Sequence, residues 1–185
     1  MKKIVALMMA LCMMVCCGIA MADAEVNWED FAGLAEQLEL NGEWVANEEW
    51  NAGFYLPAGF VEGEMTDEYA EQGVLAYFYS EDGTVQFVIM SIDLPEGATD
   101  AASFVDALHV LGYEDAEVVI VNGYEMVTYT NTDADQLTAI SVYDDGTGMA
   151  FAFSPASAEG MDMLASIMMA SLLTYDEAVE VVAQQ

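Results

Sequence analysis

The position of the basic residues and the cysteines limits, more than any other feature, what this chain can fold into. All of them lie within the first 17 residues, at Lys2, Lys3, Cys12, Cys16 and Cys17. The rest of the chain therefore has no cysteine for a disulfide or a thiolate metal site, and no Lys or Arg for a salt bridge. Its stability must come from a hydrophobic core. About 150 residues suffice for one such core, which predicts a single domain.

The N-terminus has the layout of a secretory signal peptide. Two lysines precede an apolar run from Ile4 to Ala20, and small residues follow the run. We expect this segment, residues 1–24, to be removed by cleavage after Ala22 or Ala24, and the pattern does not choose between the two sites. An uncleaved anchor is the alternative, but a run of about 17 residues is short for a span of about 20.

Lipid attachment at Cys16 or Cys17 is a second alternative for the N-terminus. The residues before them, Met13, Met14 and Val15, are not those of a lipobox. We therefore expect an extracytoplasmic protein, secreted or held in the periplasm or at the cell surface, with a cleaved signal peptide.

Cleavage after Ala22 would leave a domain with all 33 acidic residues and no Lys or Arg. Nucleic acids and anionic membrane surfaces are excluded as ligands, because their binding depends on basic side chains. The expected partners are a neutral or cationic ligand or an envelope protein. Alternatively, the charge only keeps an exported protein soluble. We also expect repulsion between carboxylates to raise their average pKa on folding.

In the first half of the chain, apolar spacing predicts one helix and four strands. Asn27 caps the helix, and Pro57 ends the second strand. The turn Glu81-Asp82-Gly83 is typical of a β-hairpin between the third and fourth strands. The expected elements are a helix carrying Trp28, Phe31, Leu34, Ala35 and Leu38 on one face, and strands at 43–46, 53–56, 73–79 and 85–92.

The second half predicts a helix, a four-stranded antiparallel meander and a final helix. Thr99 or Asp100 caps the first helix, and Gly112 ends it. Asn122-Gly123 suits a type I′ turn between the first two strands. The expected strands lie at 118–121, 124–129, 137–143 and 149–153, and Ser157 caps the final helix, with Met161, Leu164, Ala165, Met168 and Leu172 on one face.

From about Trp44 to Leu173 the sequence resembles the PsbP-like fold in plan. The resemblance rests on the strand that ends at Pro57, the hairpin, the helix, the meander with Val-Asn-Gly-Tyr-Glu-Met-Val-Thr-Tyr from Val121 to Tyr129, and Ala170-Ser171-Leu172 in the last helix. The chain is also similar to uncharacterised small acidic secreted proteins of anaerobic bacteria, through Trp28-Glu29-Asp30. The resemblance implies an α+β fold, with an antiparallel sheet of about six strands and helices packed on it, in a binding or accessory protein. It carries over no functional residue.

Catalytic chemistry has little support in the sequence. His109 is the only histidine, and a lone histidine near a helix C-terminus is favoured there by the helix dipole. A pair of carboxylates could hydrolyse glycosides, but 33 acidic residues leave no basis for choosing the pair. An enzyme is therefore the class that we expect least.

Two sets of residues are candidate binding sites. Asn131, Asp133 and Asp135 have the spacing that begins a calcium-binding loop, although Gln136 and Val142 stand where such a loop needs Gly and Glu. A polar turn between strands is the alternative. Trp44 and Trp50 flank an acidic loop and are candidates for stacking on sugars or on a partner, or for the edge of the core.

The sequence thus predicts a signal peptide at 1–24, a single α+β domain at 25–173 and a C-terminal tail at 174–185. We expect an exported, non-enzymatic binding or accessory protein that needs no cofactor other than, in one alternative, calcium. A low-affinity calcium module and a neutral-glycan module remain the alternatives.

Overall fold

The computed structural model describes residues 25–26 and 41–183 of the chain. The signal segment and the helix expected from Asn27 lie outside the described residues. The strands are β1 (Glu25–Val26), β2 (Gly42–Asn47), β3 (Ala52–Pro57), β4 (Phe60–Glu62), β5 (Val74–Ser80), β6 (Gln86–Asp93), β7 (Glu117–Val121), β8 (Tyr124–Asn131), β9 (Gln136–Val142) and β10 (Thr147–Ser154). The helices are α3 (Asp67–Glu71), α4 (Ala101–Val110), α5 (Met161–Ala170) and α6 (Tyr175–Val182).

A large sheet forms the centre of the fold, in the order β1-β7-β8-β9-β10-β6-β5-β4. All neighbouring strands pair antiparallel except β1, which runs parallel to β7. The predicted α+β class and the four-stranded meander β7 to β10 are confirmed. The sheet is larger than the expected six strands, because the short strands β1 and β4 extend its two edges.

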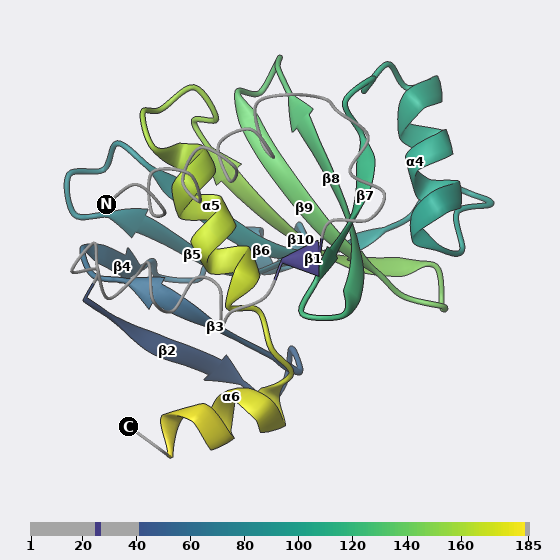
Figure 1. Ribbon diagram of the computed structural model, residues 1–185. Coiled ribbons are helices and arrows are strands. Elements are labelled where there is room, and N and C mark those ends of the chain that lie inside the picture. Colours follow the sequence, from purple (N-terminus) through teal and green to yellow (C-terminus); the bar gives the residue numbers. More distant parts are fainter. Residues whose placement is uncertain (1–24, 27–40, 184–185) are drawn as a thin grey trace, which may run out of the picture.

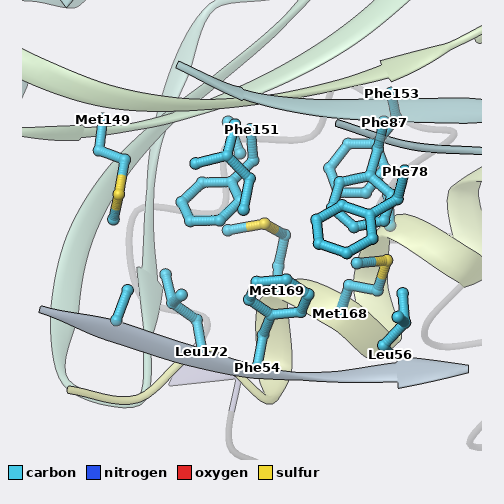
Figure 2. Packing of buried hydrophobic residues seen from close by; sticks show 14 of the residues in the cluster. Phe54, Leu56, Phe78, Phe87, Met149, Phe151, Phe153, Met168, Met169 and Leu172 are labelled. Atoms are coloured by element: carbon cyan, nitrogen blue, oxygen red, sulfur yellow. The ribbon is translucent and has the colours of Figure 1, made fainter. Parts of the chain in front are cut away.

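The main core lies between this sheet and a second layer made of α5 and the hairpin β2–β3 (Figure 1). Phe78, Phe87 and Phe153 point from three neighbouring strands of the sheet towards Phe54 of β3 (Figure 2). The ring of Phe87 stacks on that of Phe78 at 4.6 Å and on that of Phe153 at 5.6 Å, and it meets Phe54 edge-on at 5.8 Å. Methionines of α5 fill the space between the layers, as their flexible side chains suit irregular gaps.

The C-terminal segment, predicted as a tail, is the helix α6, and it covers the outer side of the hairpin β2–β3 (Figure 1). Gly53 of β3 lies against Ala178 of α6, so closely that a Cβ atom at position 53 would collide with the Ala178 side chain. Gly53 also exchanges two backbone hydrogen bonds with Leu173, at 2.9 and 2.8 Å. The hairpin is therefore held between the last two helices of the chain.

Helix α4 covers part of the opposite face of the sheet. Phe104 and Leu108 of α4 are buried against Val127, Ile140 and Ala150 of the meander. The cap is the predicted one: the carboxylate of Asp100 accepts a hydrogen bond of 2.8 Å from the backbone of Ser103. Gly112 has a positive φ of 96°, as predicted for the residue that ends the helix.

The turn between β7 and β8 has the predicted type I′ conformation, since Asn122 and Gly123 both have positive φ. The side-chain amide of Asn122 also donates hydrogen bonds to the carbonyl oxygens of Ala170, at 2.6 Å, and Leu172, at 2.9 Å. This turn is thereby tied to the end of α5, a contact that no local sequence pattern predicts.

The predicted start of the last core helix is wrong. Helix α5 begins after Gly160 rather than Ser157, because the side chain of Ser157 is bonded to Asp135, at 2.6 Å, instead of to the helix. The helix also ends at Ala170, so that Leu172 is buried beyond it, and Leu164 is only half-buried. Helix α5 packs on both β10 of the large sheet and β3 of the hairpin.

No helix within residues 25–26 and 41–183 is both long enough and apolar enough to cross a membrane.

Candidate functional site

One part of the large sheet is covered, in the described structure, only by the five-residue helix α3, which contacts β5. Helix α4 packs on β7 and β8. The same face of the sheet continues over β6, β5 and β4, where the pairs Tyr77↔Val88 and Val61↔Tyr79 are neighbours across the strands. The opposite face of these strands carries Phe78 and Phe87 of the core.

We call this surface the tyrosine face and define it by Val61, Tyr69, Tyr77, Tyr79 and Val88. Three of these side chains are exposed although they are large: Val61 is 42% exposed, Tyr69 39% and Tyr79 37%. The other two are half-buried. Exposed apolar and aromatic side chains that gather on one surface are typical of an interaction site, whereas isolated ones are ordinary.

The tyrosine rings are arranged as a connected row. Tyr77 and Tyr79 alternate with buried residues along β5, and their rings stack with centroids 6.1 Å apart and planes inclined by 27°. Tyr69 of the short helix α3 meets Tyr77 edge-on, with centroids 5.3 Å apart. Gly63 lies directly against the ring of Tyr77, where any Cβ atom would collide with that ring. The row is therefore held in place by packing at its centre.

Acidic side chains border the tyrosine face on the segments that carry it. Those of the loop after β4, of α3 and of the β5–β6 turn are exposed: Glu64, Asp67, Glu68, Glu71 and Glu81. No Lys or Arg occurs anywhere in the chain after Lys3. The face thus combines aromatic rings with carboxylates that no Lys or Arg of residues 4–185 can neutralise.

The calcium candidates lie in the turn between β8 and β9, as the alternative interpretation of a polar turn predicts. Both carboxylate oxygens of Asp135 accept hydrogen bonds from Ser157, at 2.8 and 2.6 Å. The side-chain oxygen of Asn131 accepts one of 3.1 Å from the backbone of Ala134, and Asp133 is exposed. A cation bound here would compete with these bonds. Among the residues that the structure describes, no three His, Cys, Asp or Glu side chains gather as a metal site would require.

The two tryptophan candidates do not form one site with the tyrosine face. Trp44 lies on β2, where its ring meets Tyr55 edge-on at 6.3 Å. Trp50 follows β2 in the hairpin turn and packs, half-buried, against the main core. The position of Trp50 at the edge of the core agrees with the alternative to a stacking role, and Trp44 is half-buried beside Tyr55 in the same hairpin.

His109 lies exposed near the end of α4, where one of its ring nitrogens is bonded to the backbone. Its Nε2 is 3.0 Å from the carbonyl oxygen of Ala116 and donates to it, because a carbonyl only accepts. This bond joins α4 to the segment before β7, which is a structural role.

Hydrogen bonds in turns and helix caps lower the pKa of several exposed carboxyl groups. The hydroxyls of Ser80 and Thr84 and the backbone of Thr84 lower the pKa of Asp82 to about 2. The pKa values of Asp100, Asp145 and Glu177 are also lowered, by hydroxyl and backbone donors. The expected rise through repulsion is therefore wrong for these four groups. Glu117 does have a raised pKa, first through burial and then through Asp115.

We expect Asp82→Asn to reduce stability at neutral pH and to weaken its dependence on acid. Because the pKa of Asp82 is lower in the folded state, its contribution is complete above about pH 4 and disappears as the pH falls towards 2. Urea unfolding midpoints between pH 7 and pH 2.5 would show the variant below the parent at pH 7, with the difference shrinking in acid. Asp133→Asn, in another hairpin turn, serves as the control. A constant difference at every pH would contradict this explanation.

The comparisons with known proteins concern the fold. No protein-family model and no curated protein matches the sequence. The chain is similar to the solution structure of cyanobacterial PsbP from Synechocystis, with 16% identity, a TM-score of 0.49 and coverage of 72% of this chain and 92% of that one.

Two further solved structures are similar to the chain. A Bacteroides thetaiotaomicron protein has 15% identity and a TM-score of 0.46, with coverage of 72% of this chain and 48% of that one, so the likeness spans about half of its length. The Ran-binding protein Mog1p of Saccharomyces cerevisiae has 12% identity and a TM-score of 0.41, with coverage of 76% and 98%.

Proposed function

We propose that the chain is an exported, non-enzymatic binding or accessory protein, and that the tyrosine face is the surface through which it binds its partner. The observation that carries the proposal is the row of Tyr69, Tyr77 and Tyr79. Two of its three side chains, Tyr69 and Tyr79, are more than one-third exposed, on a part of the sheet that only the short helix α3 contacts in the described structure. Tyrosine supplies large contact area with only two side-chain torsions to immobilise, and it is enriched at the centre of interfaces.

The rigid support beneath the row favours binding over a merely tolerated exposure. Tyr77 is fixed by Gly63 on one side and by the two neighbouring rings. Phe78 and Phe87 hold the strands β5 and β6 from the core side. A surface that is already ordered loses little conformational freedom when a partner binds. The signal-peptide pattern of residues 1–24 supports export, which would bring this surface outside the cytoplasm.

A photo-reactive amino acid in place of Tyr79 tests this function. In the cells that export the protein, we expect crosslinking at position 79 to yield one discrete product with a second protein. The matched control is position 124, because Tyr124 is also a strand tyrosine and is 42% exposed. Crosslinks of equal pattern and yield at both positions, or none at position 79, would contradict the proposal.

A neutral-glycan ligand is the second candidate function, and the stacked pair Tyr77 and Tyr79 favours it, because aromatic faces also pack against the apolar faces of sugar rings. Binding of this kind would not depend on the bordering carboxylates. A neutral ligand therefore predicts an affinity that stays constant between low and molar salt, where exposed charges are screened.

A further inference from the structure

We propose that the tyrosine face binds arginine side chains of a basic segment in a partner protein. This inference rests on the proposed function and names the chemistry of the partner. The occupant is a cationic polypeptide, and three features of the chain favour it: the rings, the carboxylates and the net charge.

The rings provide the first part of the argument. The face of an aromatic ring is electron-rich, so that a cation placed over it is attracted, and a planar guanidinium group can in addition stack on it. The rings of Tyr77 and Tyr79 stack on β5 with planes inclined by 27°, and the ring of Tyr79, at the outer end of this pair, belongs to a side chain that is 37% exposed. Tyr69 extends this surface from α3 with its exposed ring. Such a row suits more than one arginine along an extended segment.

The carboxylates provide the second part. The acidic side chains of α3, Asp67, Glu68 and Glu71, are all exposed on the short helix that carries Tyr69. Glu81, in the turn after β5, follows Tyr79 by two residues, whereas Glu62 pairs with Phe78 and therefore points to the other face of the sheet. Carboxylates pair with guanidinium groups through two parallel hydrogen bonds, which an ammonium group cannot form. An arginine bound at the tyrosine face would thus find acidic side chains on the segments that carry the rings.

The charge of the whole chain decides between a basic partner and the other possible occupants. The formal net charge is −31, so that two copies meeting face to face would repel each other strongly. The same field accelerates the approach of a cationic partner, an effect that weakens as ionic strength rises. Since no arginine or lysine follows Lys3, the chain cannot supply the cation itself from residues 4–185.

The experiment titrates the protein, as purified from the cells that export it, with three peptides that differ only at three spaced positions. These carry arginine, lysine or citrulline, the last being planar like arginine but uncharged. By calorimetry at low salt, we expect the arginine peptide to bind about fivefold to tenfold more tightly than the lysine peptide. The citrulline peptide should show no measurable binding. Raising the salt to 0.5 M should weaken the arginine peptide's binding.

Tyrosine-face variants locate the binding. Tyr79→Ser and Tyr69→Ser should each weaken binding of the arginine peptide by about fivefold or more, while Tyr124→Ser should leave it unchanged. The urea unfolding midpoint of each variant checks that the fold is intact, as expected for side chains at an exposed surface. Equal affinity for the arginine and lysine peptides, without an effect of Tyr79→Ser, would overturn the proposal, because it would show attraction by charge alone.

The two proposals fail in distinguishable ways. If position 79 yields one discrete crosslinked partner and the arginine peptide does not displace it, the binding function stands and the arginine inference is overturned. A crosslink from position 79 to residues 27–40 of the same chain would show that the chain itself covers the face, and it would overturn both. Arginine-peptide binding that Tyr79→Ser removes, together with a crosslinked partner that the same peptide displaces, is the expected result.

Discussion

Replacing Phe87 with alanine is expected to lower the free energy of unfolding by about 3–5 kcal/mol, a large part of the 5–15 kcal/mol typical of a domain. Phe87 is completely buried. Its ring stacks with Phe78 and Phe153 in the sheet and contacts Phe54 of the opposite layer. Truncation removes the ring from these three neighbours and from Phe60, whose ring centroid is 6.0 Å away. It leaves a cavity between rigid layers, which cannot collapse without moving the hairpin.

Equilibrium urea unfolding, followed by far-ultraviolet circular dichroism, measures this loss. Val110→Ala is the control, because Val110 is 89% exposed at the end of α4 and should change stability by less than about 0.5 kcal/mol. A loss below about 1 kcal/mol for Phe87→Ala would mean that the two layers do not close on this ring as the structure shows.

The second large effect is expected at Asn122, where two contributions can be separated. Asn122→Gly keeps the positive φ of the type I′ turn and removes the amide that donates to Ala170 and Leu172. At about 0.5–1.5 kcal/mol for each hydrogen bond, we expect a loss of about 1–3 kcal/mol. Asn122→Ala loses the same bonds and also strains the left-handed backbone, which adds about 1–2 kcal/mol.

The comparison of these two variants is the measurement. The difference in unfolding free energy between the Ala and Gly variants reports the backbone, and the loss in the Gly variant reports the link to the end of α5. Equal stability of both variants would show that the turn relaxes to another conformation. A Gly variant as stable as the parent would show that the link to Ala170 and Leu172 contributes nothing.

The sequence predicted those parts of the fold that are determined by neighbouring residues. The Asp100 cap, the Gly112 helix end and the turn at Asn122-Gly123 each place a residue where its own backbone preference is decisive. The strand β4 and the helix α3 were missed because three and five residues are too few to show a period, and α3 has no buried residue at all. Ser157 failed as a helix cap because Asp135, 22 residues earlier, binds it.

The candidate site could be predicted only in part. The alternation of Tyr77 and Tyr79 with Phe78 shows that these tyrosines share the face of β5 opposite the core, a signal that the sequence contained. The exposure of this face depends on how far α4 extends over the sheet, and nothing in the sequence of α4 reports that. Trp44 and Trp50 attracted attention by residue type, yet their surroundings at the edge of the core come from tertiary packing.

The position of the hairpin β2–β3 between α5 and α6 has a consequence for the order in which the chain can fold. Tyr55 of β3 donates its backbone N–H to the hydroxyl of Ser171, 116 residues later, and Gly53 pairs with Leu173. Contacts between such distant parts of a chain form slowly, because a long loop must close before they form. Phe54 therefore cannot be enclosed until α5 and the residues up to Leu173 have been synthesised. The proposed export requires the polypeptide to remain unfolded until it has passed through a membrane channel. A core that closes only late in synthesis suits this requirement.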